Sequence, residues 1–348
     1  MENTFKIVTK RIRVYGIVQG VGFRPTVSRH AMTSGVTGNV SNKGPFVEIF
    51  VQGSEEQTEY FLSLLKNSPP KRAVILKLDV SIVPDEEAHV YKDFDIIESN
   101  RTKGEIFISP DIAICDDCKR ELYTPGDKRY HHPFINCTCC GPRLTILDAL
   151  PYDRERTSMK EFPMCPDCSK EYYDPATRRY DAQPVCCNKC GPEVYELKKD
   201  GSKGLRGKEA ITKLREVILS GGIAAIKGIG GFHLCCNGEN EEAVMLLRQR
   251  KTRPAKPFAL MMRNIETVER ECMVPDFVRE ILTGHQKPIT LLPKKAGSRI
   301  APSVAPDNLK VGVMLPYAPI HLLLFDYDDG LTMPDTLVMT SANSSGAP

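Results

Sequence analysis

Two pairs of Cys-x2-Cys motifs constrain this sequence more than any other feature. The second pair repeats the first with every cysteine displaced by 50 residues. Neighbouring residues keep the same offset, among them Tyr123 with Tyr173 and Arg129 with Arg179. A fixed displacement of this kind predicts an internal duplication of one small module. Each copy is too short to bury a core of its own, so its folding needs another source of free energy.

The repeated cysteines have the spacing of a structural zinc site. Cys-x2-Cys lets two thiolates of one tight turn face the same ion, and two such turns supply a closed tetrahedral shell. Metal binding would then supply the folding free energy of each module. A disulfide framework and a redox-active Cys-x-x-Cys are the alternatives, which eight cysteines at a repeated spacing disfavour. We therefore predict two structural Zn²⁺ sites, with the ligands Cys115, Cys118, Cys137 and Cys140, and Cys165, Cys168, Cys187 and Cys190.

The repeat also separates ligands from nearby residues of the same type. Cys139 and Cys186 stand opposite a lysine and an asparagine in the other copy, so we exclude them as ligands. His131 and His132 stand opposite Asp181 and an alanine. We interpret these two histidines as surface residues rather than ligands.

Composition places the chain among ordinary globular proteins. It has 348 residues, enough for two or three domains, with 41% hydrophobic and 26% charged residues. Residues 1–10 are polar, and the longest apolar runs, such as 322–325, are too short to span a bilayer. With eight cysteines assigned to zinc, five remain, which favours a reducing cytoplasm. We expect no membrane partner, and a net charge of +3 does not by itself indicate nucleic acid.

A glycine-rich turn near the N-terminus has the pattern of an anion cradle. Residues 10–18 alternate as in a half-buried strand, residues 19–25 read as a turn, and residues 26–34 read as a helix. Glycines in the turn let successive backbone N–H groups approach a phosphate at the start of the helix, and Arg24 can add a bidentate cationic contact. The predicted phosphate-binding loop is Val18, Gln19, Gly20, Val21, Gly22 and Phe23.

The segments that follow complete a small domain. Strand-like patterns cover residues 37–41, 46–52, 73–83 and 94–98, and residues 55–67 read as an amphipathic helix. The order βαββαβ predicts a ferredoxin-like domain.

The C-terminal part alternates helices and strands, which favours an α/β domain with a mixed sheet. Residues 198–208 are polar and glycine-rich, so we interpret them as a linker, and residues 227–233 as a loop. The predicted strands are residues 223–226, 258–262, 289–292, 311–315 and 337–340.

Five cations lie within nine residues between Arg248 and Lys256. Alone, they fit either a solvated helix end or a basic patch for RNA. The loop beginning at Lys227 and the segment 341–346 each follow a predicted strand, where open α/β sheets place ligands. These neighbours favour a ligand site.

Residues 16–24, Gly-x-Val-Gln-Gly-Val-Gly-Phe-Arg, resemble the acylphosphatase signature, and the likeness covers about the first hundred residues. The resemblance implies that Arg24 anchors the phosphate and that Asn42 positions the attacking water, both as catalytic residues. Asn39 would be an ordinary strand residue. The alternative is a glycine-rich hairpin loop with a surface arginine.

Three C-terminal motifs together resemble the YrdC/Sua5 family, which binds ATP and forms carbamoyl-type adenylates. They are Lys-Gly-Ile-Gly-Gly-Phe-His, Arg-Lys-Thr-Arg-Pro-Ala-Lys-Pro and Thr-Ser-Ala-Asn. His233 and His321 lie in family-like stretches but receive no role. The ATP- and adenylate-binding residues that the resemblance implies are Lys227, Lys251, Arg253, Lys256, Ser341 and Asn343.

The three modules in this order resemble the HypF family of hydrogenase-maturation carbamoyltransferases. The expected boundaries are residues 1–100 (acylphosphatase-like), 108–194 (duplicated zinc fingers) and 204–348 (YrdC-like), an α+β multidomain protein. The resemblance implies hydrolysis of carbamoyl phosphate to carbamate and phosphate, and formation of carbamoyl-adenylate from ATP with Mg²⁺. It also implies transfer of the carbamoyl group to the C-terminal cysteine of a protein partner, HypE. Family members carry a further Kae1-like domain, so we expect a fragment, or a chain without the transfer step, whose YrdC-like domain is truncated.

Two functions from other classes remain as alternatives. A threonylcarbamoyl-adenylate synthase that modifies tRNA would share the C-terminal motifs, but its reaction needs no hydrolysis of an acyl phosphate. A non-catalytic zinc protein that binds nucleic acid would need more cationic surface than five clustered cations and a net +3 supply.

Overall fold

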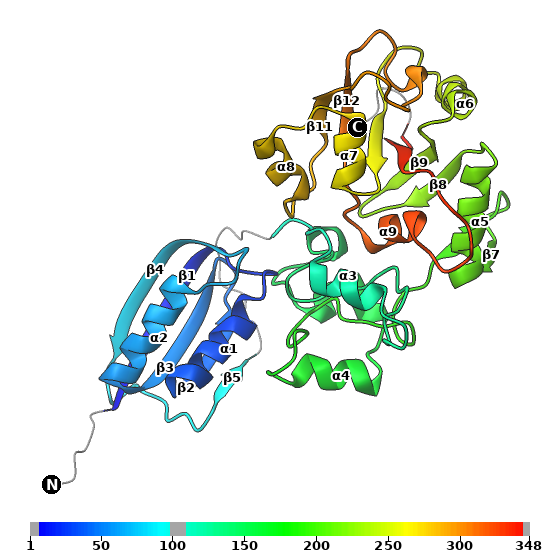
Figure 1. Ribbon diagram of the computed structural model, residues 1–348. Helices are drawn as coiled ribbons and strands as arrows, with labels where there is room; N and C mark the ends of the chain where they lie inside the picture. Colours follow the sequence, from blue (N-terminus) through cyan, green and yellow to red (C-terminus); the bar gives the residue numbers. More distant parts are fainter. Residues whose placement is uncertain (1–6, 98–108, 344–348) are drawn as a thin grey trace. The chain divides into compact units, whose positions relative to one another are not determined.

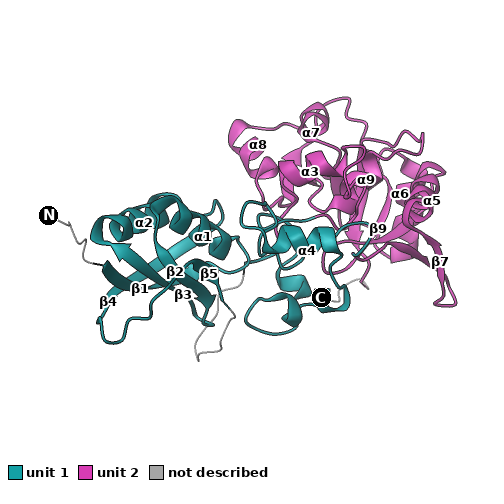
Figure 2. Ribbon diagram, turned by 90° about the horizontal axis from the view of Figure 1, so that it is seen from below, with its two compact units in different colours: residues 1–111, 136–190 teal, residues 112–135, 191–348 magenta. Residues whose placement is uncertain are grey.

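The computed structural model of the protein describes residues 7–97 and 109–343. They form two compact units (Figure 2): unit 1 comprises residues 1–111 and 136–190, and unit 2 comprises residues 112–135 and 191–348. Within the described residues, no helix combines the length and apolarity needed to cross a bilayer.

Unit 1 begins with a five-stranded sheet in the order β4-β1-β3-β2-β5. All pairings are antiparallel except that of β5 with β2. Two helices lie against one face (Figure 1). This arrangement confirms the predicted ferredoxin-like domain. The elements are β1 (Ile7–Ile17), α1 (Phe23–Ser34), β2 (Thr37–Asn42), β3 (Phe46–Ser54), α2 (Glu55–Asn67), β4 (Val74–Val83) and β5 (Phe94–Ile96).

Local sequence explains why α2 forms where it does. Ser54 and Gln57 form a reciprocal capping box at its start, which satisfies two otherwise unpaired N–H groups. Phe61 and Leu65, four residues apart on one face, are both fully buried. Burial of such a side chain stabilises a fold by about 1.5–3 kcal/mol.

Helix α1 begins at Phe23, three residues before the predicted start. Gly22 has φ 76° and caps the helix in the left-handed conformation, which glycine adopts without a steric penalty. Pro25 is tolerated in the first turn because N–H groups there have no helical partner. Arg24 therefore lies in the first helical turn and not in an irregular loop.

The duplication in sequence is also a duplication of backbone geometry. His131 and Asp181 both have positive φ, 53° and 55°. The N–H of His131 donates to the carbonyl of Leu122 at 2.8 Å, and that of Asp181 donates to Tyr172 at 2.9 Å. Each contact closes the segment after a short helix, α3 (Asp116–Leu122) in the first copy and α4 (Pro166–Tyr173) in the second.

The interpretation of His132 as a surface residue was wrong, because its side chain is 1% exposed. Its counterpart in the repeat, Ala182, is 2% exposed. This position of the repeat is therefore buried in both copies, whether histidine or alanine occupies it. His131 is half-buried, with its ring stacked on Tyr130 and Tyr327 at centroid distances of 3.9 and 4.5 Å.

Three 3-10 segments complete unit 1 between the zinc motifs, at Leu144–Ile146, Arg154–Arg156 and Ser158–Glu161.

Unit 2 contains a six-stranded sheet in the order β11-β12-β10-β13-β9-β8. Only the pairing of β10 with β12 is parallel, so the predicted mixed sheet is confirmed. The strands are β8 (Ala224–Lys227), β9 (Phe232–Asn237), β10 (Ala259–Met262), β11 (Thr290–Pro293), β12 (Lys310–Met314) and β13 (Thr336–Ser341). The helices are α5 (Gly207–Leu219), α6 (Glu241–Lys251), α7 (Ile265–Glu271), α8 (Asp276–Thr283) and α9 (Pro319–Phe325), with a 3-10 turn at Pro302–Val304.

Two segments predicted as irregular are hairpins. Within residues 227–233, Lys227 ends β8 and Phe232 begins β9, because the N–H of Gly228 donates to the carbonyl of Gly231 at 2.8 Å and closes a tight turn. Residues 198–208, predicted as a linker, contribute the turn and second strand of a hairpin of β6 (Tyr195–Leu197) with β7 (Lys203–Arg206). Glycine at both turns misled the prediction, since it marks tight hairpins as well as linkers.

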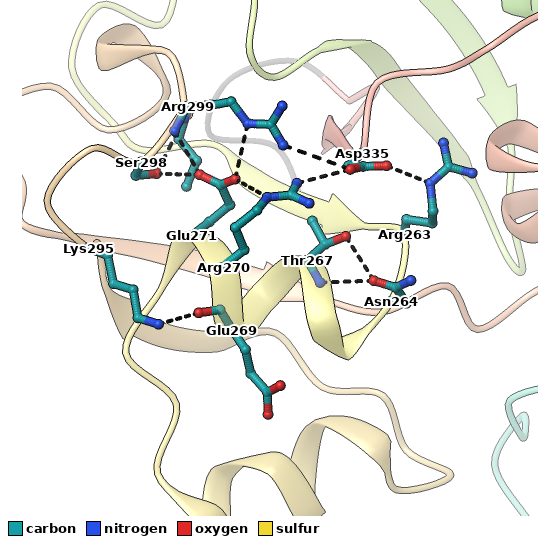
Figure 3. A network of polar contacts seen from close by, with 11 residues as sticks. Arg263, Asn264, Thr267, Glu269, Arg270, Glu271, Lys295, Ser298, Arg299 and Asp335 are labelled. Atoms are coloured by element: carbon teal, nitrogen blue, oxygen red, sulfur yellow. Dashed lines mark hydrogen bonds and ion pairs between the residues drawn. The ribbon is translucent and has the colours of Figure 1, made fainter.

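A charged network braces one side of unit 2 (Figure 3). Glu271, at the end of α7, is 1% exposed and accepts hydrogen bonds from Arg270, Ser298 and the N–H of Arg299 at 2.7–2.9 Å. Arg270 also donates to Asp335, next to β13, at 3.0 Å. The network thus joins α7 to a loop and to the central sheet.

Candidate functional site

The loop between β1 and α1 forms one wall of a pocket in unit 1 with an empty volume of about 340 Å³. Gly20 and Gly22 have φ of 70° and 76°, a conformation that glycine adopts without a steric penalty. Val21 instead packs into the hydrophobic core at 2% exposure and does not line the pocket. The other predicted loop residues line it: Val18, Gln19, Gly20, Gly22 and Phe23.

Arg24 and Asn42 line the same pocket, although they come from α1 and from the end of β2. Asn42 is 2% exposed, and its Oδ1 atom has no hydrogen-bond partner among the described residues. A buried amide oxygen without a partner favours a bound donor, such as a water molecule. The two predicted catalytic residues are thus brought together.

Arg24 is held by two carboxylates that the sequence did not suggest. Its Nη1 lies 3.1 Å from Oδ1 of Asp153, and its Nε lies 3.0 Å from Oδ2 of Asp181. Burial lowers the pKa of Arg24, but the two aspartates outweigh it and raise that pKa above its ordinary value. Burial also raises the pKa of Asp181, against the opposing effect of Arg24. The guanidinium is therefore a fixed cation whose charge is matched locally.

Arg143 is a second residue that sequence reasoning missed. It is 1% exposed, and its Nε donates to the carbonyl of Gly20 in the predicted phosphate-binding loop. Its counterpart in the repeat is Glu193, so this departure from the duplication was the available signal. The remaining guanidinium N–H groups donate, at 2.8–3.1 Å, to the carbonyls of Cys137, Thr138, Cys140 and Pro142. One side chain thus ties a cysteine knuckle to the loop.

The eight predicted ligands form two sets, and within each set the four Sγ atoms lie within 4.8 Å of one another. The Sγ–Sγ distance is 3.7 Å for Cys137 with Cys140, and 3.8 Å for Cys187 with both Cys165 and Cys190. Four thiolates bound about 2.3 Å from one Zn²⁺ would stand about 3.8 Å apart. A disulfide needs about 2 Å, so the donor atoms fit the metal.

In the second set, the pKa values of two cysteines move in opposite directions, and burial raises that of Cys187. Burial raises the pKa of Cys165, but hydrogen bonds from Cys168 and the neighbouring thiols outweigh it and lower that pKa to about 7. Thiolate is the form that binds zinc. Cys139 and Cys186 belong to neither set, as predicted.

In unit 2, three of the six predicted ATP-binding residues meet at the end of β13. Nζ of Lys251, the last residue of α6, donates to the carbonyls of Ser341 and Asn343 at 2.7 Å each. The hydroxyl of Ser341 donates to Oδ1 of Asn343. Burial and the adjacent Arg253 lower the pKa of Lys251.

The other three residues make local contacts. Arg253 donates to the carbonyls of Lys256 and Pro257 at 3.1 and 2.6 Å. Nζ of Lys227 lies 5.8 Å from the ring centroid of Phe232, and no hydrogen bond within the described residues joins it to the other five.

Arg248, which the sequence suggested only as one of the five clustered cations, is 6% exposed and donates to the carbonyls of Ser303, Arg253 and Lys256. This contact shapes the loop that carries Arg253 and Lys256. Because a cation used in this way is not available to a polyanion, it argues against a basic patch for RNA.

Models of three families match successive parts of the chain. The Acylphosphatase model matches residues 10–96, and the HypF finger model matches residues 114–147 and 164–195. The Sua5–YciO–YrdC model, described as Telomere recombination, matches residues 216–348.

Whole-length comparisons agree with these matches. The chain is 45% identical to Carbamoyltransferase HypF2 of Cupriavidus necator, in an alignment that takes in 99% of this chain and 44% of that protein. It is 46% identical to Probable carbamoyltransferase HypF of Methanocaldococcus jannaschii, over 97% of this chain and 43% of that protein. A crystal structure of full-length HypF in the phosphate- and nucleotide-bound form is similar with a TM-score of 0.91 and 44% identity, over 100% of this chain and 44% of that one. The chain thus spans less than half the length of these relatives.

Proposed function

Because the chain belongs to the HypF carbamoyltransferase family, we propose that it carries the first two steps of a carbamoyl transfer for [NiFe] hydrogenase maturation. Carbamoyl phosphate is hydrolysed in the unit 1 pocket, and the carbamate is then activated with ATP in unit 2. The carbamoyl-adenylate serves transfer to the C-terminal cysteine of HypE. One observation carries the proposal: Asn42, which is separate in sequence from the glycine loop and Arg24, lines the same pocket as they do.

The first step follows from the chemistry of those groups. Backbone N–H groups of the loop bind the phosphoryl oxygens, with Arg24 fixed at the pocket wall. The unpartnered Oδ1 of Asn42 accepts a hydrogen bond from a water molecule, and this contact orients the oxygen of the water toward phosphorus. The new bond joins water oxygen to phosphorus, and the bond from phosphorus to the acyl oxygen breaks. Carbamate leaves, and the phosphate keeps the oxygen of the water.

The second step uses the residues around β13. Oxygen of carbamate attacks the α-phosphorus of ATP, and pyrophosphate leaves. Lys251 and Arg253 offset the negative charge that develops, and Ser341 and Asn343 contact the nucleotide beside Lys251. Lys227 and Lys256 contribute further cations at the same site. Mg²⁺, bound with the nucleotide, would supply further charge stabilisation.

Thiolate sets of this kind persist as metal ligands in a reducing compartment, which supports a cytoplasmic location. The metal in both sets is zinc, with a structural role, because four protein sulfurs leave no open position.

The test of the first step is release of phosphate from carbamoyl phosphate. We expect Arg24→Ala and Asn42→Ala to lower the rate about 10²–10³-fold, the usual effect of removing one group that stabilises a transition state. Asn39→Ala is the matched control, since Asn39 lies on the same strand but does not line the pocket. Equal rates for the Asn42 and Asn39 variants would exclude the assigned water-positioning role.

The test of the second step is ATP binding by calorimetry. Lys251→Ala combined with Arg253→Ala should weaken binding at least tenfold. Arg250→Ala, an exposed cation on the same helix, should not. Formation of labelled pyrophosphate only when carbamoyl phosphate is also present would link the two steps.

A further inference from the structure

Among the described residues that line the unit 1 pocket, two have a buried side-chain oxygen without a hydrogen-bond partner. The first is Oδ1 of Asn42, which takes part in the hydrolysis proposed above. The second is Oε1 of Gln19, a residue that is 3% exposed. A buried acceptor left without a donor costs about 1–3 kcal/mol. The oxygen of Gln19 therefore requires a donor as much as that of Asn42 does.

One hydrogen bond fixes the orientation of the Gln19 amide. Its Nε2 donates to the carbonyl of Gly44 at 2.7 Å. Because a carbonyl only accepts, the nitrogen must be the atom beside Gly44, and Oε1 is the atom without a partner. Gly44 lies two residues after Asn42, in the turn that joins β2 to β3. The amides of Gln19 and Asn42 are therefore both held at the same end of β2.

The side chains around the pocket do not supply the donor. Nη1 and Nε of Arg24 contact Asp153 and Asp181. The guanidinium of Arg143 donates to main-chain carbonyls. The other lining donors also have acceptors of their own: the hydroxyl of Thr138 with the carbonyl of Arg178, the hydroxyl of Tyr152 with the carbonyl of Pro142, and Nε2 of Gln183 with Asp181. A molecule bound in the pocket is the remaining source of a donor.

Two groups in the hydrolysis reaction carry suitable hydrogens. The attacking water has two O–H groups, of which Asn42 accepts one, and the carbamoyl group of the substrate has an NH₂ group. The geometry favours the water, because the Gln19 amide is tethered to the turn that follows Asn42. A water molecule held by one hydrogen still rotates about that bond, whereas one held by both has a fixed orientation.

We propose that Gln19 is the second acceptor for the attacking water. The water donates one hydrogen to Oδ1 of Asn42 and the other to Oε1 of Gln19, and a lone pair on its oxygen forms the new bond to phosphorus. The bond from phosphorus to the acyl oxygen breaks, and its electron pair leaves with carbamate. Both hydrogens end on the phosphate product as dihydrogen phosphate, because a neutral amide accepts a hydrogen bond without taking the proton. This inference rests on the hydrolysis proposed for unit 1.

Two substitutions separate this role from the tether to Gly44. Gln19→Lys keeps a donor for the carbonyl of Gly44 but has no acceptor, and Gln19→Met has neither. We expect both to lower the kcat for carbamoyl phosphate hydrolysis about tenfold to a hundredfold without raising the KM, because a misoriented nucleophile slows the chemical step. A normal kcat in Gln19→Lys would assign Gln19 to the tether alone and overturn the proposal.

Gln52→Met is the matched control for these variants. Nε2 of Gln52 also donates to a main-chain carbonyl, that of His89, at 2.9 Å, but Gln52 does not line the pocket. Loss of its amide should leave the kcat unchanged. A fall in kcat equal to that of Gln19→Met would show that any lost tether in this domain slows the reaction, and would count against a specific role for Gln19.

Acetyl phosphate distinguishes the water from the NH₂ group of the substrate. It has a methyl group in place of NH₂ and so offers no donor at its acyl end. If Gln19 holds the water, Gln19→Met should lose the same factor in kcat with acetyl phosphate as with carbamoyl phosphate. A loss confined to carbamoyl phosphate would overturn the proposal and assign Oε1 to the carbamoyl NH₂ group. If the unsubstituted chain releases phosphate from neither substrate, the proposed hydrolysis itself is wrong.

A combined variant measures whether the two amides act on one water. Asn42→Ala with Gln19→Met should be only slightly slower than Asn42→Ala alone, because groups that act as a unit have non-additive effects on the rate. Losses that multiply would place Gln19 in a separate role and contradict the proposal.

The arrangement can also be observed without turnover or substitution. Bound orthovanadate takes a five-coordinate form that mimics phosphorus in the transition state, with one apical oxygen in place of the attacking water. In a crystal of the unsubstituted chain with orthovanadate, we expect this oxygen about 2.6–3.2 Å from both Oδ1 of Asn42 and Oε1 of Gln19. Contact with Asn42 alone would refute the role of Gln19 even if no variant folds. Vanadate bound elsewhere would instead refute the phosphoryl site.

Discussion

The net charge of the unit 1 pocket depends on the buried Arg24 and on two partly buried carboxylates that contact it. Arg24 lies between Asp153 and Asp181, so the proposed phosphate site does not offer an uncompensated cation. The two carboxylates fix the orientation of the guanidinium at the cost of weaker attraction for an anion. Neutralising one carboxylate should therefore loosen the orientation of the Arg24 guanidinium and at the same time raise the affinity of the pocket for an anion.

Asp181→Asn tests this directly. We expect the kcat for carbamoyl phosphate hydrolysis to fall about tenfold, because Arg24 loses an ionic anchor, while inorganic phosphate inhibits at lower concentration, because a negative charge leaves the pocket. Initial rates with and without phosphate measure both. Asp148→Asn is the control, since Asp148 pairs with Lys160 on the surface. A fall in kcat with unchanged phosphate inhibition would mean that Asp181 acts only through stability.

Arg143 should affect the loop through the carbonyl of Gly20. Lysine cannot reproduce a guanidinium that donates to five carbonyls, so Arg143→Lys should recover little of what Arg143→Ala loses. We expect both to raise the KM for carbamoyl phosphate about tenfold or more, with a smaller change in kcat. Zinc content measured by elemental analysis should stay at the value of the unsubstituted chain; loss of zinc together with activity would point to general unfolding of the knuckle.

The sequence identified Arg24 and Asn42 but not Asp153, Asp181 or Arg143, for a physical reason. The first two belong to a short local pattern in which the backbone itself makes the site. The other three reach the loop only after the chain between them has folded, and contacts across more than a hundred residues leave no periodicity to read. Residues that depart from the internal repeat, as Asp181 and Arg143 do, were the available signal.

At the level of elements, the second cysteine set is itself the core of its module. Three of the five buried residues in that cluster, Cys165, Cys168 and Cys187, are the ligands. Too little apolar surface remains to hold the fold without the metal. The ferredoxin-like sheet differs, since its core contains fifteen buried apolar residues from strands and helices, from Ile12 to Leu65.

Removal of the metal should therefore unfold one part of unit 1 and spare the other. After chelation, we expect amide hydrogen exchange in α4 to lose protection, while β1 and β3 stay protected. Cys168→Ser should reproduce the effect without a chelator. Cys139→Ser, at an exposed cysteine outside both sets, should not. Retained protection of α4 in the metal-free chain would show that the module folds without its ions.

The network around Glu271 gives unit 2 a dependence on pH. Burial raises the pKa of Glu271, but hydrogen bonds from Arg270, the N–H of Arg299 and Ser298 outweigh it, so that pKa lies below its ordinary value of 4.5. A group with a depressed folded pKa contributes stability above pH 4.5 and loses it as the pH falls through the folded value. Asp335, whose pKa is also lowered, acts in the same direction.

Glu271→Gln should destabilise unit 2 by about 1.5–3 kcal/mol at pH 7, the range for hydrogen bonds to a charged group. The free energy of unfolding of unit 2 should also decrease less steeply between pH 5 and pH 3 than in the unsubstituted chain. Denaturant unfolding at a series of pH values measures both. Glu269→Gln, on the same helix but paired with Arg279 at the surface, should leave the pH profile unchanged. An unaltered slope in Glu271→Gln would assign the acid sensitivity to other carboxylates.

Element prediction was best where the pattern was local and regular. The capped helix α2 has the predicted bounds, and the cysteine repeat predicted both metal sets. Strand β9 was missed because its residues, Phe232–Asn237, follow a glycine-rich turn and include two adjacent buried cysteines that break alternation. Its strand conformation comes from pairing with β8 and β13, which is a tertiary contact.

At the scale of the whole molecule, the proposed chemistry divides between the two compact units. Hydrolysis belongs to residues of unit 1, and use of ATP belongs to residues of unit 2. Carbamate is the only species that the second step needs from the first. A defect in hydrolysis should therefore be repaired by supplying carbamate, whereas a defect in nucleotide binding should not.

Arg24→Ala should form pyrophosphate from ATP with carbamoyl phosphate about 10²–10³-fold more slowly, but at the unsubstituted rate with fresh ammonium carbamate. Lys251→Ala combined with Arg253→Ala should fail with both, because its defect lies after carbamate. Initial rates of labelled pyrophosphate release, with bicarbonate alone as the control for decomposed carbamate, distinguish the variants. Failure of carbamate to restore Arg24→Ala would mean that the second step takes its acyl group directly from carbamoyl phosphate. Arg24 would then be required for delivery of the acyl group and not only for hydrolysis.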